Sequence, residues 1–579
     1  MTRPLTPDNQ ALARSNWTWQ DGLLILAIVA LIFGIVKTAA QFSGSYNDQF
    51  QAQVSLSVLP SYTAQTLLRM VAAYLLSLIF TLIYAYIAYY SKTASRVLIP
   101  LLDILQSIPV LSIAPGVVLA LIGLFPGQRI GVELASILLI FTSMTWNMTF
   151  SFYQSLSSIP RELREAAQVY RLSLWQRFWT LELPSGVIGL VWNSVMAWAG
   201  GWFTLIVIES LTVGDKNFTL PGLGSFLGAA ANHGNLEMIG WGLADLIGLI
   251  ILIDFFLWRP LIAWAEKFKF ESVETQNAPE SFVLDFLRRS PTLRVLHERV
   301  WQPLSTGLAR GLSRTSHQDP LAFNPDRNSS LGQWIGWLFT SGLAIVVLWG
   351  TWEAVLLLRH LGWSDWQAVM TGAVLTALRV FISLILSLVW TVPVGVAIGR
   401  NPRLAQVLQP IVQIAASVPA TALFPVLLLF LIHLAGGRQL ASIILMMLGT
   451  MWYILFNVIA GAQAIPAELF EAAVVYKLPP IERWRTLILP GIFPYLITGI
   501  ITAVGGAWNA SIVSEYIQFQ NQTINNPGLG SIITQASAKG QYPLLLAATV
   551  VLSILVVLTN RLIWRPLYRI AEEKYQLLV

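Results

Sequence analysis

Long apolar runs separated by short polar segments make up most of the chain. Each run reaches the roughly 20 apolar residues that a helix needs to cross a bilayer. The runs lie at 22–40, 66–90, 97–125, 132–152, 185–208 and 238–258, and again at 332–357, 371–398, 404–432, 438–461, 491–513 and 541–564. The first run could also be a signal peptide, but its counterpart lies mid-chain, so we interpret both as spans. The pattern predicts an all-α integral membrane protein.

The second set of six runs repeats the first. At an offset of 310, Thr66 and Arg69 match Thr376 and Arg379, and Ser107 and Pro109 match Ser417 and Pro419. Further along the offset is 306, so that Trp202 matches Trp508 and Glu209 matches Glu515. Because each copy has an even number of spans, the copies are expected to be parallel repeats of six transmembrane helices each. We expect a first repeat at 1–260, a linker at 261–331 and a second repeat at 332–579.

Composition agrees with a membrane protein. Of the 579 residues 55% are hydrophobic and 11% are charged, whereas soluble domains are about 25% charged. The net charge of +6 could suggest nucleic acid, but the basic residues lie in short loops beside apolar runs, as the positive-inside rule predicts. With no cysteine, the chain has no disulfide, thiolate metal site or cysteine nucleophile.

The basic residues also predict an orientation. Arginines such as Arg161, Arg177 and Arg565 fall on one side of the membrane, whereas the loop at 41–65 on the other side has no Lys or Arg. Both termini and the linker are therefore expected to be cytoplasmic. Within the linker, 281–312 mixes apolar and basic residues, which suits either an amphipathic helix or a solvated connection.

One polar segment between the spans occurs twice, as IPRELREAAQVYRLSLWQRFWTLELP at 159–184 and IPAELFEAAVVYKLPPIERWRTLILP at 465–490. Pro160 and Pro466 predict helix starts. The helix dipole favours carboxylates in the turns that follow, where Glu162 and Glu468 lie. Paired alanines then leave a face of small side chains that another protein could approach. The segment predicts a short docking helix on the cytoplasmic side.

This spacing resembles the EAA loop of importer-type ABC transporter permeases, in which the loop is a cytoplasmic coupling helix that fits a cleft in the ATP-binding subunit. The resemblance implies an ATPase-coupling role for Glu162, Glu165, Ala166, Ala167, Arg171, Glu468, Glu471, Ala472, Ala473 and Lys477. Arg171 and Lys477 stand where the family usually has glycine, which favours positive φ or close approach. Either the turn is made differently here, or the basic side chain contacts the partner.

Motifs for catalysis are missing from the sequence. There is no GxxxxGK[ST] loop, so ATP hydrolysis is expected on a separate subunit and the chain itself is not predicted to be an enzyme. The histidines have no paired spacing, and no metal or other cofactor is expected. They are His233, His297, His317, His360 and His433.

Polar residues inside or at the ends of spans usually face a cavity, which makes them pathway candidates. Arg69 and Arg379 could attract an anion or could snorkel to headgroups. Glu209 and Glu515 each precede a Pro-Gly-Leu-Gly run, which resembles the nitrate, sulfonate and taurine branch of the permeases. Alternatively, these glutamates hold the outer loop by hydrogen bonds. This structural role is favoured if the pathway carries an anion, because carboxylates in the pathway would repel the substrate.

The fifth span of each repeat adds Trp202, Trp508 and Asn509, since this span lines the pathway in the family that the chain resembles. Packing through the neighbouring Gly200 and Gly506 is the alternative. The sixth spans differ between the repeats, because Asp245 and Asp254 in the first correspond to Val551 and Asn560 in the second.

These features together predict a duplicated and fused permease of an ABC importer in the bacterial plasma (inner) membrane, with lipid around its spans. Two ATP-binding subunits and a substrate-binding protein are the implied partners, and the branch implies a small anion such as nitrate, a sulfonate or bicarbonate. A gradient-driven secondary transporter is the alternative, because twelve spans in two parallel halves also describe that class. It would not need paired EAA loops.

Overall fold

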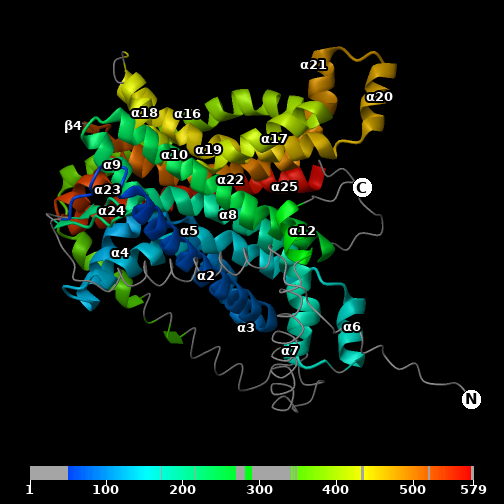
Figure 1. Cartoon of the computed structure of the whole chain (residues 1–579), viewed down its shortest axis with the longest axis horizontal. Helices are drawn as coiled ribbons and strands as arrows, with labels where there is room; N and C mark the ends of the chain where they lie inside the picture. Colours follow the sequence, from blue (N-terminus) through cyan, green and yellow to red (C-terminus); the bar gives the residue numbers. More distant parts are fainter. Residues whose placement is uncertain are drawn as a thin grey trace, which may run out of the picture. The chain divides into compact units, whose positions relative to one another are not determined.

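The fold is given by a computed structural model that describes residues 50–170, 172–213, 216–268, 281–289, 348–431, 436–519 and 522–574, with 341, 342, 345 and 434 (Figure 1). These residues fall into two compact units. Unit 1 takes in the described residues of 150–195 and 252–289, and unit 2 takes in those of 50–149, 196–251 and 341–574. The predicted span at 22–40, Arg171, most of the linker and the start of the span at 332–357 lie outside the described residues.

The first repeat is built mainly from helices. They are α2 (Leu59–Tyr90), α3 (Lys92–Ser107), α4 (Val110–Leu124), α5 (Arg129–Ser157), α6 (Arg161–Val169), α7 (Leu174–Arg177), α8 (Leu183–Ile208), α9 (Leu223–Asn232), α10 (Leu236–Ile253) and α11 (Arg259–Ala265), which runs into the predicted linker. The linker itself contains α12 (Phe282–Arg289). Shorter turns are η3 (Phe178–Glu182), η4 (Asp254–Trp258) and η5 (Glu266–Phe268). A hairpin of β1 (Thr212–Val213) and β2 (Lys216–Asn217) pairs Thr212 with Asn217.

The second repeat has the same order of elements. Its helices are α16 (Trp363–Arg400), α17 (Pro402–Ser417), α18 (Ala420–Leu431), α19 (Gly437–Ala464), α20 (Ala467–Val475), α21 (Pro480–Arg483), α22 (Leu489–Glu515), α23 (Leu529–Ala538), α24 (Tyr542–Thr559) and α25 (Arg565–Lys574), with turns η8 (Trp484–Ile488) and η9 (Asn560–Trp564). Its hairpin of β3 (Tyr516–Phe519) and β4 (Gln522–Asn525) pairs Tyr516 with Asn525. The described part of the chain is therefore all-α apart from two short hairpins.

Eight stretches of continuous helix in the described part of the chain are long and apolar enough to cross a membrane. They contain eight of the twelve predicted spans. The stretches are Leu59–Tyr90, Arg129–Ser157, Trp175–Ile208, Leu236–Phe268, Trp363–Arg400, Gly437–Ala464, Pro480–Glu515 and Tyr542–Ala571. Leu236–Phe268 runs on past the expected end of the first repeat at residue 260.

The third predicted span of each repeat, at 97–125 and 404–432, is formed by two helices that meet at a sharp bend. In the first repeat α3 and α4 meet at 101°, and in the second α17 and α18 meet at 82°. The cause is the matched pair Pro109 and Pro419. A residue before proline avoids the helical region, and Ile108 (φ −82°, ψ 120°) and Val418 (φ −75°, ψ 120°) are both extended. Each helix therefore breaks one residue before the proline.

Four of the long helices contain a π-helical turn. In the first repeat η3 leads into α8 and η4 follows α10, and in the second repeat η8 leads into α22 and η9 follows α24. Phe178 and Trp484, which begin η3 and η8, are separated by the repeat offset of 306, as are Asp254 and Asn560. Such turns insert one residue into a helix and often occur at functional positions. The sequence pattern gave no sign of them.

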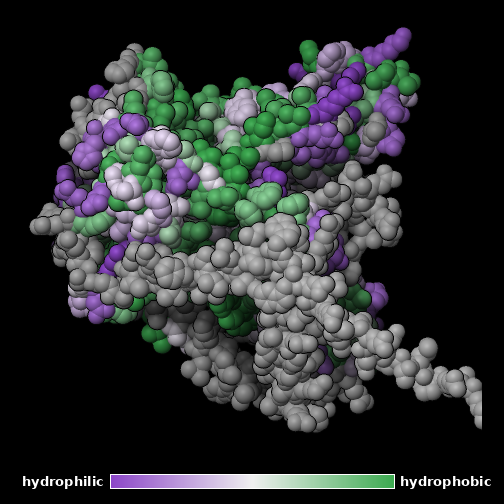
Figure 2. Space-filling view, in the orientation of Figure 1, coloured by the Kyte–Doolittle hydropathy of each residue, from purple (hydrophilic) through white to green (hydrophobic). Residues whose placement is uncertain are grey.

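Within unit 2, α16 packs along α19, and α19 packs along α22. A Cβ atom on Gly506 of α22 would lie 3.0 Å from the carbonyl oxygen of Gly449 on α19, so the missing side chain lets the helices approach closely. Helix α20 lies at one end of this unit, and α9, α23 and β4 lie at the opposite end (Figure 1). Figure 2 shows hydrophobic side chains over the middle, around α17 and α19, and hydrophilic ones around α20 and α21.

Candidate functional sites

The two predicted docking helices are present as α6 and α20. Each begins one residue after its proline, since Pro160 (φ −55°, ψ 145°) and Pro466 (φ −55°, ψ 142°) are the N-cap residues. Glu162 and Glu468 lie in the first turn, where the helix dipole favours a carboxylate. Glu165 and Glu471, one turn further on, are exposed.

The alanine pairs lie differently from the prediction. Ala167 and Ala473 are buried, with 5% and 2% of their surface exposed, and Ala166 and Ala472 are half-buried. The alanines thus let each short helix pack against its own chain as much as they offer a face to another protein. The coupling role of these four residues stays a prediction.

The most exposed apolar residues of the docking helices were missed from the sequence. Val169 and Tyr170 end α6 and are each 78% exposed, and Val475 and Tyr476 end α20 and are 77% and 79% exposed. Adjacent exposed apolar residues on a polar segment indicate a contact surface. A signal was available, because the Val-Tyr step occurs at the same place in both copies.

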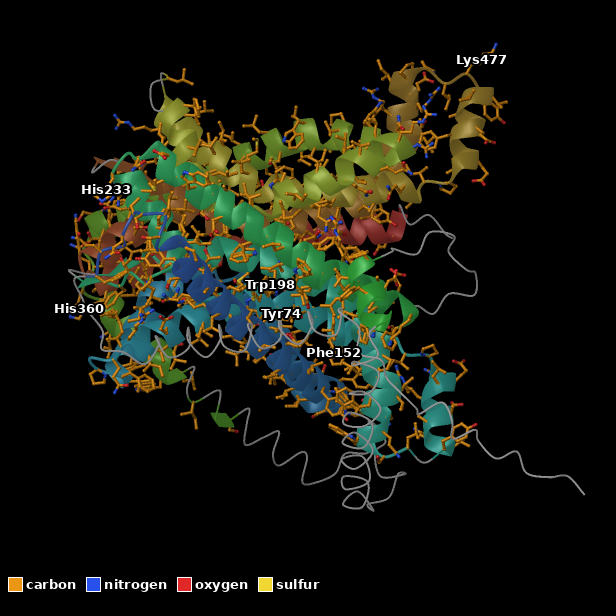
Figure 3. The ribbon with its side chains drawn as sticks, viewed as in Figure 1. Tyr74, Phe152, Trp198, His233, His360 and Lys477 are labelled. Atoms are coloured by element: carbon orange, nitrogen blue, oxygen red, sulfur yellow. The ribbon has the colours of Figure 1, made fainter. Side chains whose placement is uncertain are left out.

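The end of α20 answers the question raised by the missing glycine. Lys477 has φ 53° and is the only residue other than glycine with positive φ among those that the structure describes. Leu478 N donates to Ala473 O at 3.0 Å and Lys477 N to Val474 O at 2.9 Å, the two bonds of a helix end that is closed by one residue with positive φ. The turn is therefore the one that glycine would make, with a lysine side chain exposed on it (Figure 3). In the first copy Leu172 N donates to Ala167 O at 3.0 Å.

A second candidate site is a buried cluster of charges in unit 2. Arg69 on α2 is fully buried and binds two carboxylates. Its Nε lies 2.5 Å and its Nη2 2.9 Å from the two oxygens of Glu133, and its Nη1 lies 2.7 Å from Glu209 Oε1. Arg129 adds a second cation, 2.8 Å from Glu133 Oε1. The four charges compensate one another, as burial away from water requires.

Glu209 also fixes the loop that ends in Pro-Gly-Leu-Gly. Its carboxylate accepts hydrogen bonds from Thr66 Oγ1 at 2.8 Å and from Gly224 N at 2.7 Å. A Cβ atom on Gly222 would overlap this carboxylate, so no larger residue fits there. The glutamate therefore ties the loop to the core through its side chain.

The second repeat has a smaller version of the same arrangement. Glu515 accepts from Arg379 Nη1, Thr376 Oγ1 and Gly530 N, each at 2.8 Å. At the position of Glu133 the second repeat has Gln439, so Arg379 binds one carboxylate and is 8% exposed.

These contacts bear on the alternatives for the arginines and glutamates. Arg69 and Arg379 are buried and bound to carboxylates, so neither snorkels. For Glu209 and Glu515 the contacts support the structural alternative, in which each glutamate holds the loop that ends in Pro-Gly-Leu-Gly by hydrogen bonds. A direct role of the four residues in the pathway stays a prediction.

The fifth-span candidates are placed within the core of unit 2. Trp202 is 3% exposed and Trp508 is fully buried. Asn509 instead reaches the other repeat, because its Oδ1 accepts a hydrogen bond of 2.9 Å from Val110 N, the first residue of α4. The amide thus satisfies one of the free N–H groups at the broken helix. The corresponding residue of the first repeat is Phe203, which has no such acceptor.

The difference between the sixth spans has a structural explanation. Asp245 accepts a hydrogen bond from Thr63, and both positions are apolar in the second repeat, with Val551 and Ala373. Asp254 pairs with Arg259 at 2.8 Å in unit 1.

In the second repeat the residue at the place of Asp254 is Asn560, and Arg565 pairs with Asp103 of α3 in unit 2 instead. Each carboxylate thus has a local partner. No group of three or more possible metal ligands occurs within the described ranges.

Comparisons with known proteins place the chain in a family. The family model described as binding-protein-dependent transport system inner membrane component matches it twice, at residues 77–258 and 391–564. A nitrate import permease protein of Leptolyngbya laminosa is 26% identical over 221 residues, 38% of this chain and 75% of that protein.

A bicarbonate transport system permease protein of Synechocystis sp. is 31% identical over 123 residues, 21% of this chain and 42% of that protein. A taurine transport system permease protein of Escherichia coli is 24% identical over 180 residues, 31% of this chain and 62% of that protein. The chain thus spans less than two thirds of the length of these two relatives. Because the two segments that match the family model make up more than half of the residues, the chain belongs to the inner membrane components of binding-protein-dependent transport systems.

Proposed function

We propose that this chain supplies both membrane halves of an ATP-driven importer for a small anion. One chain supplies both halves, and two ATP-binding subunits dock on α6 and α20. ATP-driven closure of these subunits would move the two helices and switch the pathway between the two sides of the membrane by rocking of the halves. A substrate-binding protein would deliver the anion from outside.

The observation that carries this proposal is the matched pair of docking helices. Both begin after proline, carry a carboxylate in the first turn and end in an exposed Val-Tyr step, Val169-Tyr170 and Val475-Tyr476. A partner with two equivalent subunits would meet the same surface twice. The ten predicted coupling residues, Arg171 among them, are part of this proposal.

The orientation follows from charge. The α6 and α20 segments and the ends of the chain carry the basic residues, so we place both termini and both docking helices in the cytoplasm. The opposite end of unit 2, with α9 and α23, would then face outward. We also propose the division into repeats at 1–260 and 332–579 with a cytoplasmic linker at 261–331, where α12 occupies part of the expected amphipathic stretch.

The anion class rests on the relatives, whose names refer to nitrate, bicarbonate and taurine. A gradient-driven secondary transporter is disfavoured, because both repeats match the same family of binding-protein-dependent systems. The pathway candidates would then lie around the anion pathway or behind the residues that line it. These candidates are Arg69, Trp202, Glu209, Arg379, Trp508, Asn509 and Glu515.

Reconstitution tests the proposal. The chain is purified with candidate ATP-binding subunits and placed in liposomes with a candidate substrate-binding protein, and uptake of labelled nitrate, bicarbonate, taurine and an alkanesulfonate is measured with and without ATP. We expect ATP-dependent uptake of one of these anions. Uptake that needs no ATP and follows a proton or sodium gradient would rule the proposal out.

A charge-reversed variant tests the docking helices. Glu165→Arg with Glu471→Arg should abolish co-purification of the ATP-binding subunits or uncouple ATP hydrolysis from uptake. The matched control is Glu237→Arg with Glu573→Arg, which reverses two exposed carboxylates that are not part of α6 or α20 and should behave like wild type. Equal behaviour of the two double variants would contradict docking at these helices.

A further inference from the structure

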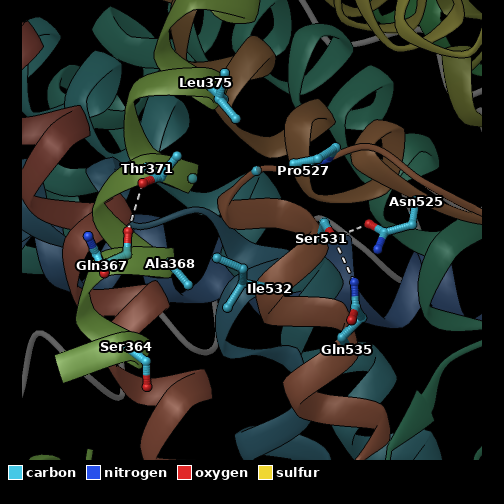
Figure 4. Close-up of a pocket in the computed structure, with 12 residues that line it drawn as sticks. Ser364, Gln367, Ala368, Thr371, Leu375, Asn525, Pro527, Ser531, Ile532 and Gln535 are labelled. Atoms are coloured by element: carbon cyan, nitrogen blue, oxygen red, sulfur yellow. Dashed lines mark hydrogen bonds between the residues drawn. The ribbon is translucent and has the colours of Figure 1, made fainter. Parts of the chain in front are cut away.

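A pocket of about 500 Å³ (Figure 4) opens at the end of unit 2 where α23 and β4 lie, opposite α20 (Figure 1). One wall is the beginning of α16 and the other is the segment from β4 into α23. The lining residues are Ser364, Gln367, Ala368, Thr371, Gly372, Leu375, Asn525, Pro527, Gly528, Ser531, Ile532 and Gln535. None of them carries a charge, and six of them have a hydroxyl or amide side chain.

The polar groups of the pocket fall into two sets. On the α23 side Gln535 Nε2 donates to Ser531 Oγ at 2.9 Å, and Ser531 in turn donates to Asn525. On the α16 side the side chains of Ser364 and Gln367 are exposed and make no hydrogen bond to other described residues. One wall is thus held in place, and the other offers unused donors and acceptors.

The first repeat differs at two of the residues that line this pocket. At the place of Gly372 it has Tyr62, which is 6% exposed and accepts a hydrogen bond of 3.2 Å from Gln53 N. At the place of Ile532 it has Phe226, which is fully buried. Two buried aromatic rings therefore stand where the second repeat has a glycine and a smaller side chain.

The lining indicates what kind of group the pocket takes. A free anion or a lipid phosphate is held by cations or by free N–H groups at a helix start. No lining residue is cationic, and the N–H groups of Leu529 and Gly530 at the start of α23 already donate to Thr376 and Glu515. Hydroxyls and amides suit the backbone and uncharged polar side chains of another protein. Under the proposed function this end faces outward, where the substrate-binding protein on which the family depends would arrive.

We infer that the pocket receives an uncharged polar loop of the substrate-binding protein. This inference rests on the proposed function and adds an unequal contact, in which the second repeat holds a loop and the first repeat does not. The binding protein would therefore dock on this fused permease in one orientation.

The test compares equivalent positions of the two repeats. Gln367→Trp places a large side chain at the mouth of the pocket without removing a packed group, and Ser57→Trp makes the same change at the matching exposed position of the first repeat. Binding of the substrate-binding protein that supports uptake is measured on the permease with its ATP-binding subunits in nanodiscs.

For Gln367→Trp we expect Kd to rise at least about tenfold, as when one good interface contact is lost. Stimulation of ATP hydrolysis by the binding protein should fall, while hydrolysis without it stays unchanged. Ser57→Trp should bind like wild type. A second variant, Ser364→Ala with Gln367→Ala, should also weaken binding, because it removes only the unused polar groups.

Wild-type affinity in Gln367→Trp, or an equal loss in Ser57→Trp, would overturn the inference. Failure of the proposed function looks different, since the wild-type complex would then show no ATP-dependent uptake with any binding protein.

Discussion

The guanidinium carbon of Arg400 lies 3.2 Å from the centroid of the Phe470 ring. Arg400 is the last residue of α16, and Phe470 is on α20, the proposed docking helix of the second repeat. The same α16 carries Thr376 and Arg379, which bind Glu515. One continuous helix of 38 residues thus joins the docking helix to the buried charges at the other end of unit 2. In the first copy the residue at the place of Phe470 is Arg164, which donates to Ser157 O at 3.0 Å.

Replacing Phe470 should weaken the link between ATP hydrolysis and transport. The Phe470→Ala change removes a cation–π contact worth about 0.5–2 kcal/mol, so α16 would follow α20 less closely. We expect the number of anions taken up per ATP hydrolysed to fall several-fold while hydrolysis continues. The control is Arg403→Gln, an exposed cation near the start of α17. An unchanged ratio in Phe470→Ala would remove Arg400 and Phe470 from the coupling path.

Lys477→Gly should stabilise the end of α20. A side chain in the left-handed region costs about 1–2 kcal/mol, which glycine avoids. The amide hydrogen of Leu478, which donates to Ala473 O, should then exchange with deuterium roughly fivefold more slowly or better, as measured by hydrogen exchange. Lys477→Ala distinguishes the effect of the charge from that of the backbone conformation, because alanine removes the charge but keeps the strain of a side chain at positive φ. Slower exchange in the alanine variant as well would show that the charge, and not φ, matters.

Gly222→Ala and Gly528→Ala should both be strongly destabilising. The new Cβ would overlap the carboxylate of Glu209 in one case and of Glu515 in the other, and would break buried ionic hydrogen bonds. We expect a loss of about 3 kcal/mol or more, seen as a lower Tm and a lower yield of monodisperse protein. Gly228→Ala on α9 is the matched control, because its nearest neighbour would be Ser210 Cβ at 3.7 Å. That change should be neutral or slightly stabilising.

Loss of the buried arginine should matter more in the first repeat than in the second. Arg69→Met leaves Glu209 without its cation and Glu133 with Arg129 alone, and breaking such a buried cluster costs about 3–5 kcal/mol. Arg379→Met leaves only one carboxylate, that of Glu515, without its cation, so the Tm of this variant should fall less than that of Arg69→Met. Thermal unfolding in detergent measures both. Adding Glu515→Gln to Arg379→Met should restore part of the loss, and no recovery would contradict the ion pair as its cause.

The sequence was sufficient for the duplication, for eight spans and for the two short helices α6 and α20. Apolar runs of membrane length and a motif repeated at one offset are local signals that do not depend on packing. The bend at Pro109 and Pro419 was also visible in principle, because both prolines had been matched between the repeats. Their effect was missed because the apolar run continues unbroken across each bend.

Partnerships between distant residues could not be predicted. Nothing in the spacing of Arg69, Glu133 and Glu209 shows that α2, α5 and the turn after α8 bring them together, and Glu133 was not singled out at all. The contact of Asn509 with Val110 joins positions that the repeat pattern does not relate. Such contacts depend on how helices pack in three dimensions, which periodicity along one helix does not contain.

The π-helical turns indicate how the duplicated chain evolved. Their positions agree between the two halves although many neighbouring side chains have diverged, as Asp254 and Asn560 have. An inserted residue shifts every later side chain around the helix, so two independent insertions at the same two places are improbable. The turns therefore belonged to an ancestral permease of half this length, before its gene was copied and joined into one reading frame.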